Sequence, residues 1–326
     1  MSPRRILIAT ASGMAASAMM QTQLANATPR IVEELASPDL YGFVAGSYLI
    51  ASTLALPLFA QYADRLGPRR VFVAGHICFA VGTAGLVLAP TMHALIAARI
   101  VQGLGAGAIA PAALASLGLV LDERARAHAF SQLAAVQVVA NVIGAPLGGW
   151  FTDGPGWRPG LLTVLPLSLI SLLLAGSLPT AQAPPRWWRV SAREQAGLWR
   201  DRELRRYAGL ATLVGAVLLG LLTYAPLALQ ALHGLDATTT GWLLAPALIG
   251  IGLGTAASGP LADRRWVRPA GWALAACCLP LALLPHLVVV AAALMMAGTA
   301  WASCSRCCCS TPSPRHRRTA WPRPGR

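Results

Sequence analysis

The sequence of 326 residues contains no lysine and few charged residues of any kind. Charged residues make up 12% of the chain and apolar residues 56%, whereas a soluble domain usually carries about 25% charged residues. This scarcity excludes an ordinary soluble protein and indicates a chain that crosses a membrane repeatedly. The formal charge of +14 comes from arginines between apolar runs. Because no basic segment studded with aromatic residues is present, nucleic acid is not expected as a partner.

Enzyme motifs are also missing from the sequence. It has no metal-binding H-E-x-x-H, no nucleophile elbow and no phosphate loop, so neither catalysis nor a cofactor is expected. Near its end the chain contains Cys304, Cys307, Cys308 and Cys309, with the Cys-x-x-Cys spacing of a metal or redox site. No second pair or histidine follows at the spacing of zinc ligands, so no metal site is expected.

Ten apolar runs are long enough to cross about 30 Å of hydrocarbon, which takes about 17 to 25 residues of helix. They lie near residues 6–28, 41–62, 71–89, 93–118, 128–151, 160–178, 207–229, 240–261, 270–285 and 286–302. The expected class is an all-α polytopic membrane protein, with the lipid bilayer as its surroundings.

The arginines divide the connecting loops into two groups. If the N-terminus is cytoplasmic, seventeen arginines fall in cytoplasmic segments and two, Arg30 and Arg158, fall in outer loops, leaving aside Arg99 and the tail. Positive charge is retained on the cytoplasmic side of a membrane. The sequence therefore predicts a multi-pass protein of the inner (plasma) membrane with its N-terminus in the cytoplasm.

Residues 1–27 admit two interpretations. A basic start, an apolar stretch and Ala25-Asn26-Ala27 are typical of a cleavable signal peptide. The later turns instead carry Gln21, Thr22, Gln23 and Asn26, as a helix that lines a cavity would. These polar side chains favour a first helix that is retained.

One arginine falls inside an apolar run, where its charge is costly. Arg99 lies in the fourth run, with Gln102 and Gly103 on the same helix face. An arginine in a membrane helix by default marks a polar cavity, although Arg99 is close enough to the outer loop to reach the interface instead. Gly103 and Gly107 form a G-x-x-x-G surface on which a second helix can pack closely.

The fifth run carries amides and glycines on one stripe, because they recur at intervals of three and four residues. The amides are Gln137 and Asn141. The small residues are Gly144, Gly148 and Gly149, with Pro146 among them, and they allow a second backbone to approach. Either a cavity lining or a purely packing role fits these glycines.

A charged turn separates the second and third runs. Its residues include Asp64, Arg65, Gly67, Arg69 and Arg70. Gly67-Pro68 is expected to end the preceding helix, since proline disfavours helix at the residue before it. A similar sequence returns at residues 259–265 with Asp263 and Arg264, so the chain is expected to contain two copies of one unit.

These motifs resemble those of a known family. Ala60-Gln-Tyr-Ala-Asp64-Arg65-Leu-Gly67-Pro-Arg69-Arg70 resembles the loop signature of the major facilitator superfamily between its second and third helices. The run from Arg99 to Gly107 is similar to the fourth-helix signature, and Gly144 to Gly149 resembles the fifth-helix signature of its drug:proton antiporters, with proline displaced by one position.

The resemblance implies two six-helix repeats that alternately expose a central cavity to each side. It implies an N-terminal half (1–178), a cytoplasmic Arg- and Trp-rich linker (179–206), which is either solvated or lies on the inner leaflet, and an incomplete C-terminal half (207–302). The Cys-, Pro- and Arg-rich residues 303–326 are expected to be foreign to the fold. Our hypothesis is that the reading frame is truncated or shifted, which resequencing the locus would test.

The implied function is a monomeric exporter of small amphipathic molecules or drugs, driven by the proton gradient. Its cytoplasmic gating loops would be the charged turn with Asp64 and the repeat with Asp263. The expected cavity residues are Gln21, Thr22, Asn26, Arg99, Gln102, Gln137, Asn141, Thr223, Tyr224 and Gln230. Alternatives are a sugar or amino acid exporter and a membrane protein that does not transport.

Proton coupling lacks an obvious carrier in the sequence. Many of these exporters carry an aspartate in the first helix, where this chain has Gln21-Thr22-Gln23, and no acidic residue lies in the middle of a predicted span. His76 is the one imidazole expected to be well buried. A buried histidine is either a packed core residue or a proton carrier, and the sequence leaves both interpretations open.

Overall fold

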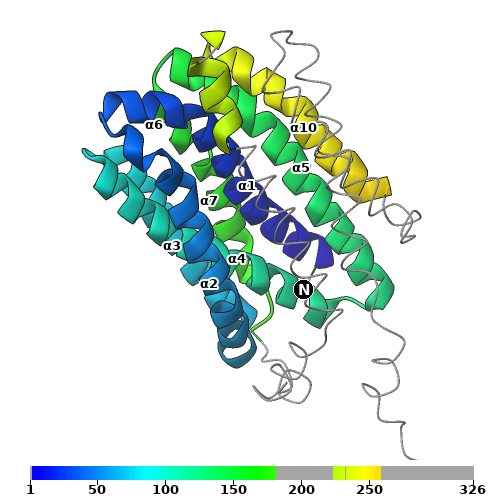
Figure 1. The fold of residues 1–326 in the computed structure, drawn as a ribbon. Helices are drawn as coiled ribbons and strands as arrows, with labels where there is room; N and C mark the ends of the chain where they lie inside the picture. Colours follow the sequence, from blue (N-terminus) through cyan, green and yellow to red (C-terminus); the bar gives the residue numbers. More distant parts are fainter. Residues whose placement is uncertain (1, 181–222, 232, 258–326) are drawn as a thin grey trace, which may run out of the picture. The chain divides into compact units, whose positions relative to one another are not determined.

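The computed structural model describes residues 2–180, 223–231 and 233–257, and all regular structure in these ranges is helical (Figure 1). The expected all-α class is confirmed for this part of the chain. The chain divides into two compact units, Met1–Arg189 with Leu222–Pro246, and Val190–Leu221 with Ala247–Arg326. The first unit contains nearly all of the described residues. The expected linker beyond residue 180, the last two spans and the tail lie outside them.

The described helices follow one another along the chain with short connections. They are α1 (Pro3–Glu34), the short η1 (Pro38–Leu40), α2 (Tyr41–Leu66), α3 (Pro68–Leu88), α4 (Met92–Val120), α5 (Glu123–Asp153), α6 (Trp157–Leu162), α7 (Leu165–Leu174), the short η2 (Ala175–Ser177) and α10 (Ala237–Ala257). Residues 223–231 are also helical.

The helix ends have local causes in the sequence. Gly67 has φ +85°, which favours glycine, and Pro68 begins α3. The predicted helix end at Gly67-Pro68 is therefore confirmed. The side chain of Thr91 caps α4 by accepting a hydrogen bond from the Ala94 N–H, and Asp122 caps α5 in the same way.

Five segments of the described residues are long and apolar enough to cross a membrane by length and composition. They correspond to η1 with α2, to α3, to α4, to α5, and to the stretch Trp157–Ser177. The last was expected as one run but is broken between α6 and α7. The 32-residue α1 is not among the five, because amides and hydroxyls occupy its later turns. These polar groups need partners inside the protein.

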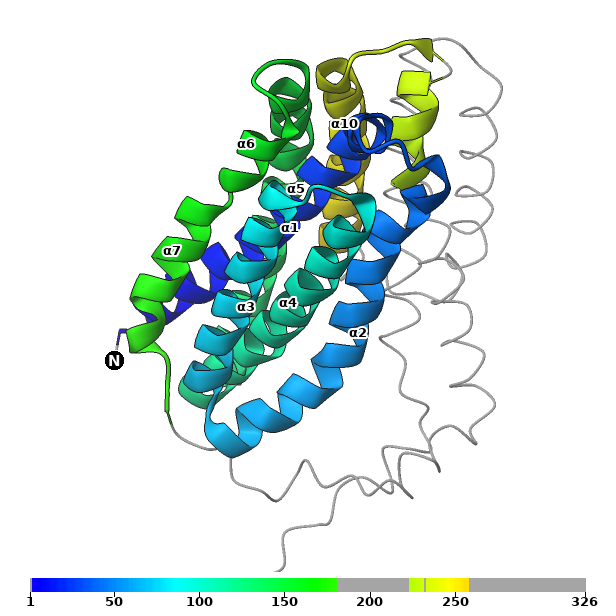
Figure 2. The ribbon, with the colours of Figure 1, turned by 90° about the vertical axis from the view of Figure 1, so that its left-hand side faces the viewer.

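The first unit is packed around α1 and α4 (Figure 2). α1 contacts α2, α4, α5, α6 and α7, and α4 lies between α2 and α3. Glycines permit this close packing: a Cβ atom built on Gly103 would lie 2.6 Å from the Tyr48 carbonyl oxygen, and one on Gly107 equally close to that of Ser52. α4 therefore approaches α2 backbone to backbone along the Gly103–Gly107 stripe.

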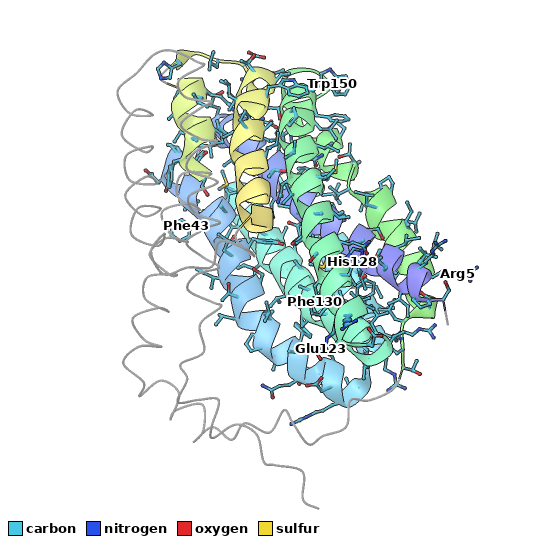
Figure 3. The ribbon with its side chains drawn as sticks, turned by 90° about the vertical axis from the view of Figure 1, so that its right-hand side faces the viewer. Arg5, Phe43, Glu123, His128, Phe130 and Trp150 are labelled. Carbon is cyan, nitrogen blue, oxygen red and sulfur yellow. The ribbon has the colours of Figure 1, made fainter. Side chains whose placement is uncertain are left out.

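Large apolar side chains also point outward from the unit. Phe43 on α2 and Phe130 and Trp150 on α5 are labelled among them in Figure 3, and Phe43 and Trp150 are more than half exposed. A soluble domain seldom exposes apolar surface on this scale. The exposed side chains of α5, Phe130 and Trp150, are suited to contact with lipid.

Candidate functional site

The side chain of Arg99 is enclosed by protein and only 1% exposed. Its Nε donates a hydrogen bond to the Val44 carbonyl oxygen at 3.0 Å, and its Nη2 donates to Gln21 Oε1 at 3.1 Å. Its Nη1 donates to Gln102 Oε1. The guanidinium carbon lies 4.2 Å from the centre of the Tyr48 ring, a cation–π arrangement. Arg99 thus joins α4 to α1 and α2, and its guanidinium group is enclosed among these helices.

Gln102 extends this set of polar contacts to α3. Its Nε2 donates to Thr83 Oγ1 at 2.9 Å, and the Thr83 hydroxyl donates to the Phe79 carbonyl oxygen. Gln102 and Thr83 are both fully buried. The polar residues Gln21, Arg99, Gln102 and Thr83 therefore form a continuous chain across α1, α4 and α3, and we call it the Arg99 network.

A second buried polar group centres on Asn26, which is 0% exposed. Its Nδ2 donates to the carbonyl oxygens of Ala145 at 3.0 Å and Ala237 at 2.7 Å. Gln230 Nε2 donates to the backbone carbonyl oxygen of Asn26 at 3.1 Å. Two expected cavity residues, Asn26 and Gln230, are therefore brought together. They connect α1 to α5, to the start of α10 and to the helical residues 223–231.

The expected packing residues of α5 lie between α1 and α10. A Cβ on Gly148 would lie 2.6 Å from the Cα of Gln23, and Gly144 faces α1 one turn earlier. Gly149 instead faces the backbone of Ala237, and Pro146 lies against Gly241 of α10. These small residues bring the three backbones within reach of the Asn26 amide.

A groove of about 680 Å³ runs along α2 and α4. It is bordered by Asp39, Gly42, Phe43, Gly46, Ser47, Ile50, Ala51, Leu54, Ile96, Ile100, Leu104 and Tyr224. Its wall is apolar apart from Asp39, Ser47 and Tyr224. Among the expected cavity residues, Tyr224 borders this groove, whereas Arg99 and Gln102 are buried away from solvent.

Tyr224 is positioned by its neighbour Tyr41. The centres of the two rings are 5.4 Å apart, and the Tyr41 hydroxyl donates to the carbonyl oxygen of Thr223 at 2.8 Å. Thr223, an expected cavity residue, thus contributes its backbone to this contact. Ser47 is 9% exposed, and its hydroxyl has no hydrogen-bond partner among the described residues.

The remaining expected residues lie outside these two polar groups. Thr22 is half-buried and donates to the Met19 carbonyl oxygen at 3.1 Å. Gln137 and Asn141 are half-buried on α5 and make no hydrogen bond to Arg99 or Asn26. In the charged turn, Asp64 is half-buried, and the arginines that flank it, Arg65, Arg69 and Arg70, are exposed. Asp263 and Arg264 lie outside the described residues.

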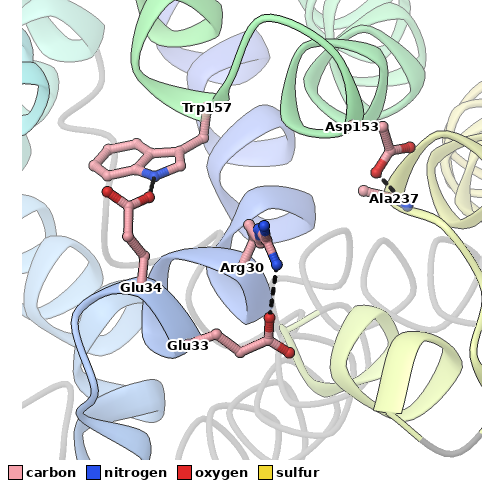
Figure 4. Close-up of polar contacts among 6 residues, drawn as sticks. All are labelled: Arg30, Glu33, Glu34, Asp153, Trp157 and Ala237. Atoms are coloured by element: carbon pink, nitrogen blue, oxygen red, sulfur yellow. Dashed lines mark hydrogen bonds and ion pairs between the residues drawn. The ribbon is translucent and has the colours of Figure 1, made fainter.

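Sequence reasoning missed the contacts at the end of the unit where α1 finishes, which we call the Glu34 end. Asp153 accepts hydrogen bonds from the backbone N–H groups of Ala237 at 3.1 Å (Figure 4) and of Thr238 at 2.7 Å. Glu34 accepts one from Trp157 Nε1 at 2.6 Å and pairs with Arg158. The sequence places these residues in outer loops but carries no signal of how they pair.

Glu34 lies beyond the apolar run of α1, and its two partners alter its acidity. Hydrogen bonding from Arg158, and then from Trp157, lowers the pKa of the Glu34 carboxyl below its ordinary value of 4.5. Glu34 is thus held in its charged form. No group of three metal-ligating side chains occurs in the part of the chain that the structure describes.

The sequence of this chain is similar to those of known membrane transporters. A sequence profile of the Major Facilitator Superfamily matches residues 7–321. MFS-type transporter Rv1877 of Mycobacterium tuberculosis is 36% identical over 186 residues, which cover 56% of this chain and 27% of that protein. Multidrug resistance protein 3 of Bacillus subtilis is 31% identical over 171 residues, which cover 52% of this chain and 33% of that protein. The matches thus span about a quarter to a third of the length of these relatives.

A solved structure shares the fold. The crystal structure of a bacterial homologue of the human lysosomal transporter Spinster matches with a TM-score of 0.79 and 20% identity, covering 98% of this chain and 77% of that one. At this identity the likeness concerns the fold alone.

Proposed function

The chain belongs to the major facilitator superfamily, and from this membership we propose that it is a secondary transporter that exports small amphipathic molecules, drugs among them, in exchange for protons. As a member it is a multi-pass membrane protein and not an enzyme. We also propose that it is a monomer in the plasma membrane. The arginine distribution favours a cytoplasmic N-terminus. We also propose that the chain contains two repeated halves, residues 1–178 and residues from 207 onward, joined by the linker 179–206.

The groove along α2 and α4 is the observation that supports an amphipathic substrate. Its volume of about 680 Å³ falls in the range of about 300 to 1,000 Å³ that is common for sites of small molecules. Ile50, Ile100 and Leu104 supply an apolar wall, while the carboxylate of Asp39 and the ring of Tyr224 border the groove. A ligand with an apolar body and one polar or cationic group fits this lining.

Two relatives support drugs as the class of substrate. Multidrug resistance protein 3 and multidrug transporter MdtP of Bacillus subtilis are 31% and 32% identical to this chain over 171 and 157 residues. Each match covers about a third or less of the relative's length, so substrate and activity are part of the proposal.

An efflux assay tests the proposal. Cells that lack their own drug pumps would express the full chain and be loaded with ethidium. We expect lower dye accumulation than in cells without the protein, and an uncoupler should abolish the difference. Accumulation that is the same with and without the protein, and insensitive to the uncoupler, would count against active export.

A pair of variants links transport to the groove. Ile100→Trp adds bulk to a side chain that borders the groove, so we expect reduced efflux. Ile77→Trp makes the same change on α3, where the side chain is 54% exposed and does not border the groove. Equal efflux by the two variants at equal expression would show that the substrate does not pass through this groove.

A further inference from the structure

His76 lies within α3, and its side chain is 2% exposed. Its Nδ1 is 2.9 Å from the carbonyl oxygen of Phe72, one turn earlier in the same helix. A carbonyl oxygen can only accept a hydrogen bond, so Nδ1 carries the hydrogen when the ring is neutral. The lone pair of the neutral imidazole is consequently on Nε2.

Nε2 has no hydrogen-bond partner among the described residues, and it lies against the backbone of Gly13 in α1. A Cβ built on Gly13 of α1 would lie 2.7 Å from His76 Nε2 and 2.8 Å from Ser171 Oγ of α7. The Ser171 hydroxyl donates its hydrogen to the Ala9 carbonyl oxygen at 2.7 Å, so its oxygen still has a lone pair to accept another hydrogen bond. A basic nitrogen and an acceptor oxygen therefore flank the same point on α1.

We propose that His76 Nε2 is the proton-binding site that couples the proton gradient to movement of α1. This inference rests on the proposed transport function. The step transfers a proton from a hydronium ion to the Nε2 lone pair, which leaves water and an imidazolium. The protonated Nε2 is then a hydrogen-bond donor. Ser171 Oγ, on the other side of the Gly13 backbone, can serve as its acceptor.

No other ionisable side chain among the described residues is available to take the proton at this position. Gly13 and Ser171, which face His76 from α1 and α7, do not titrate. In α3 and the described elements packed against it, the ionisable side chains other than His76 lie at the helix ends, with three exceptions. Arg99 and Tyr48 contact each other, and the thiol of Cys78, on α3 itself, donates to the Val101 carbonyl oxygen. No carboxylate lies in the middle of a described span, so none neutralises the imidazolium.

Protonation at this position acts on the helix that also carries both polar groups of the candidate site. Gln21, which belongs to the Arg99 network, is about 12 Å along α1 from Gly13 at 1.5 Å per residue. Asn26 is farther along the same helix. An uncompensated charge is costly in a buried site, so the protonated state favours a position of α1 in which Nε2–H reaches an acceptor. By linkage, a substrate that biases α1 also changes the proton affinity of His76.

Proton release from the purified full chain tests the coupling. Tetraphenylphosphonium is added to the protein in weakly buffered detergent solution. We expect the probe to bind and the protein to release protons, which a pH indicator detects. His76→Gln should still bind the probe but lose most of this release, whereas His93→Gln and His128→Gln, which alter exposed histidines, should retain it. Ser171→Ala keeps the imidazole and should lower the release by removing the acceptor. Full release by His76→Gln would overturn the inference and leave the proposed transport intact.

A second measurement covers failure of binding or folding. In the unmodified chain labelled with ¹⁵N-histidine, we expect one solvent-protected imidazole to pass from the neutral to the charged form as the pH is lowered. If neither the wild type nor any variant binds the probe, the proposed function fails. The titration of the protected imidazole then decides by itself whether His76 binds a proton. A protected imidazole that stays neutral down to the pH at which the protein unfolds would overturn the inference.

Discussion

Asp153, at the end of α5, holds Thr238 at the start of α10 by two hydrogen bonds. Its carboxylate accepts one from the backbone N–H of Thr238 at 2.7 Å and one from the Thr238 hydroxyl at 2.6 Å. The first N–H groups of a helix have no partner within the helix, and the helix dipole favours a negative charge there. Asp153 therefore caps a helix to which it is not adjacent in sequence, and it fixes α5 to α10 at the Glu34 end.

Replacing Asp153 with alanine should loosen this junction. The substitution removes the acceptor for the first turn of α10, and loss of a capping side chain costs about 1 kcal/mol. We expect a lower free energy of unfolding, measured by thermal or denaturant unfolding of the purified protein in detergent. Thr152→Ala is the matched control, because the Thr152 hydroxyl bonds to the Gly148 carbonyl oxygen within its own helix. Equal stability of the two variants would contradict the capping role.

Substitution by alanine should affect stability differently at two glycines of α4, Gly103 and Gly118. In Gly103→Ala the new methyl group would lie 2.6 Å from the Tyr48 carbonyl oxygen, so α2 and α4 must separate. We expect a loss of about 1 to 3 kcal/mol in the free energy of unfolding, typical of overpacking. In Gly118→Ala the methyl group meets nothing within 4 Å. That variant should be as stable as the wild type or more stable by up to about 1 kcal/mol, because alanine is the better helix former.

Unfolding measurements on both variants distinguish a clash between α2 and α4 from a general sensitivity of α4 to alanine substitution. Equal destabilisation by both alanines would contradict the backbone-to-backbone packing of α2 and α4.

The helix end at Gly67 and the partners of Arg99 show what can and cannot be predicted from the sequence. Gly67-Pro68 acts on its own backbone, so two adjacent residues suffice to predict where α2 ends. Arg99 could be expected to avoid lipid because of its charge. Its partners could not, since Val44 and Gln21 are 55 and 78 residues away. Val44 contributes a backbone carbonyl oxygen, which any residue type would supply.

The sixth span illustrates an intermediate case. A continuous apolar run predicts one helix near residues 160–178, but hydropathy does not distinguish an unbroken helix from one with a break. The structure places the break between α6 and α7, where Thr163 lies and accepts a hydrogen bond from Gln23 Nε2 at 2.8 Å. Pro166, in the first turn of α7, is the local signal for this break. The Gln23 contact depends on packing between distant helices.

Arg99→Lys should impair the protein although it keeps the positive charge. An ammonium group cannot reproduce the planar guanidinium that donates to Val44, Gln21 and Gln102 at once and stacks on Tyr48. Leaving a buried polar acceptor without its donor costs about 1 to 3 kcal/mol. We expect reduced thermal stability and reduced ethidium efflux at equal expression. Wild-type values for both measurements would show that charge alone is sufficient at this position.

The pH dependence of stability should depend on Glu34. Its pKa is lowered in the folded protein, chiefly by the hydrogen bond from Arg158. The folded state therefore binds this proton less readily than the unfolded chain does. The resulting stabilisation is fully present above the ordinary carboxyl pKa of 4.5 and is lost as the pH falls through the folded value. Glu34→Gln should lower the melting temperature at pH 7, and the difference from wild type should shrink as the solution is acidified.

Glu33→Gln is the matched control for this prediction. Glu33 lies one residue earlier and pairs with Arg30 at 3.2 Å, with both side chains about two-thirds exposed. An exposed pair on one helix contributes little to stability, so the melting curve of Glu33→Gln should follow that of the wild type from pH 7 to pH 4. A Glu34→Gln difference that stayed constant over this range would mean that Glu34 stabilises the Glu34 end through packing and not through its charge.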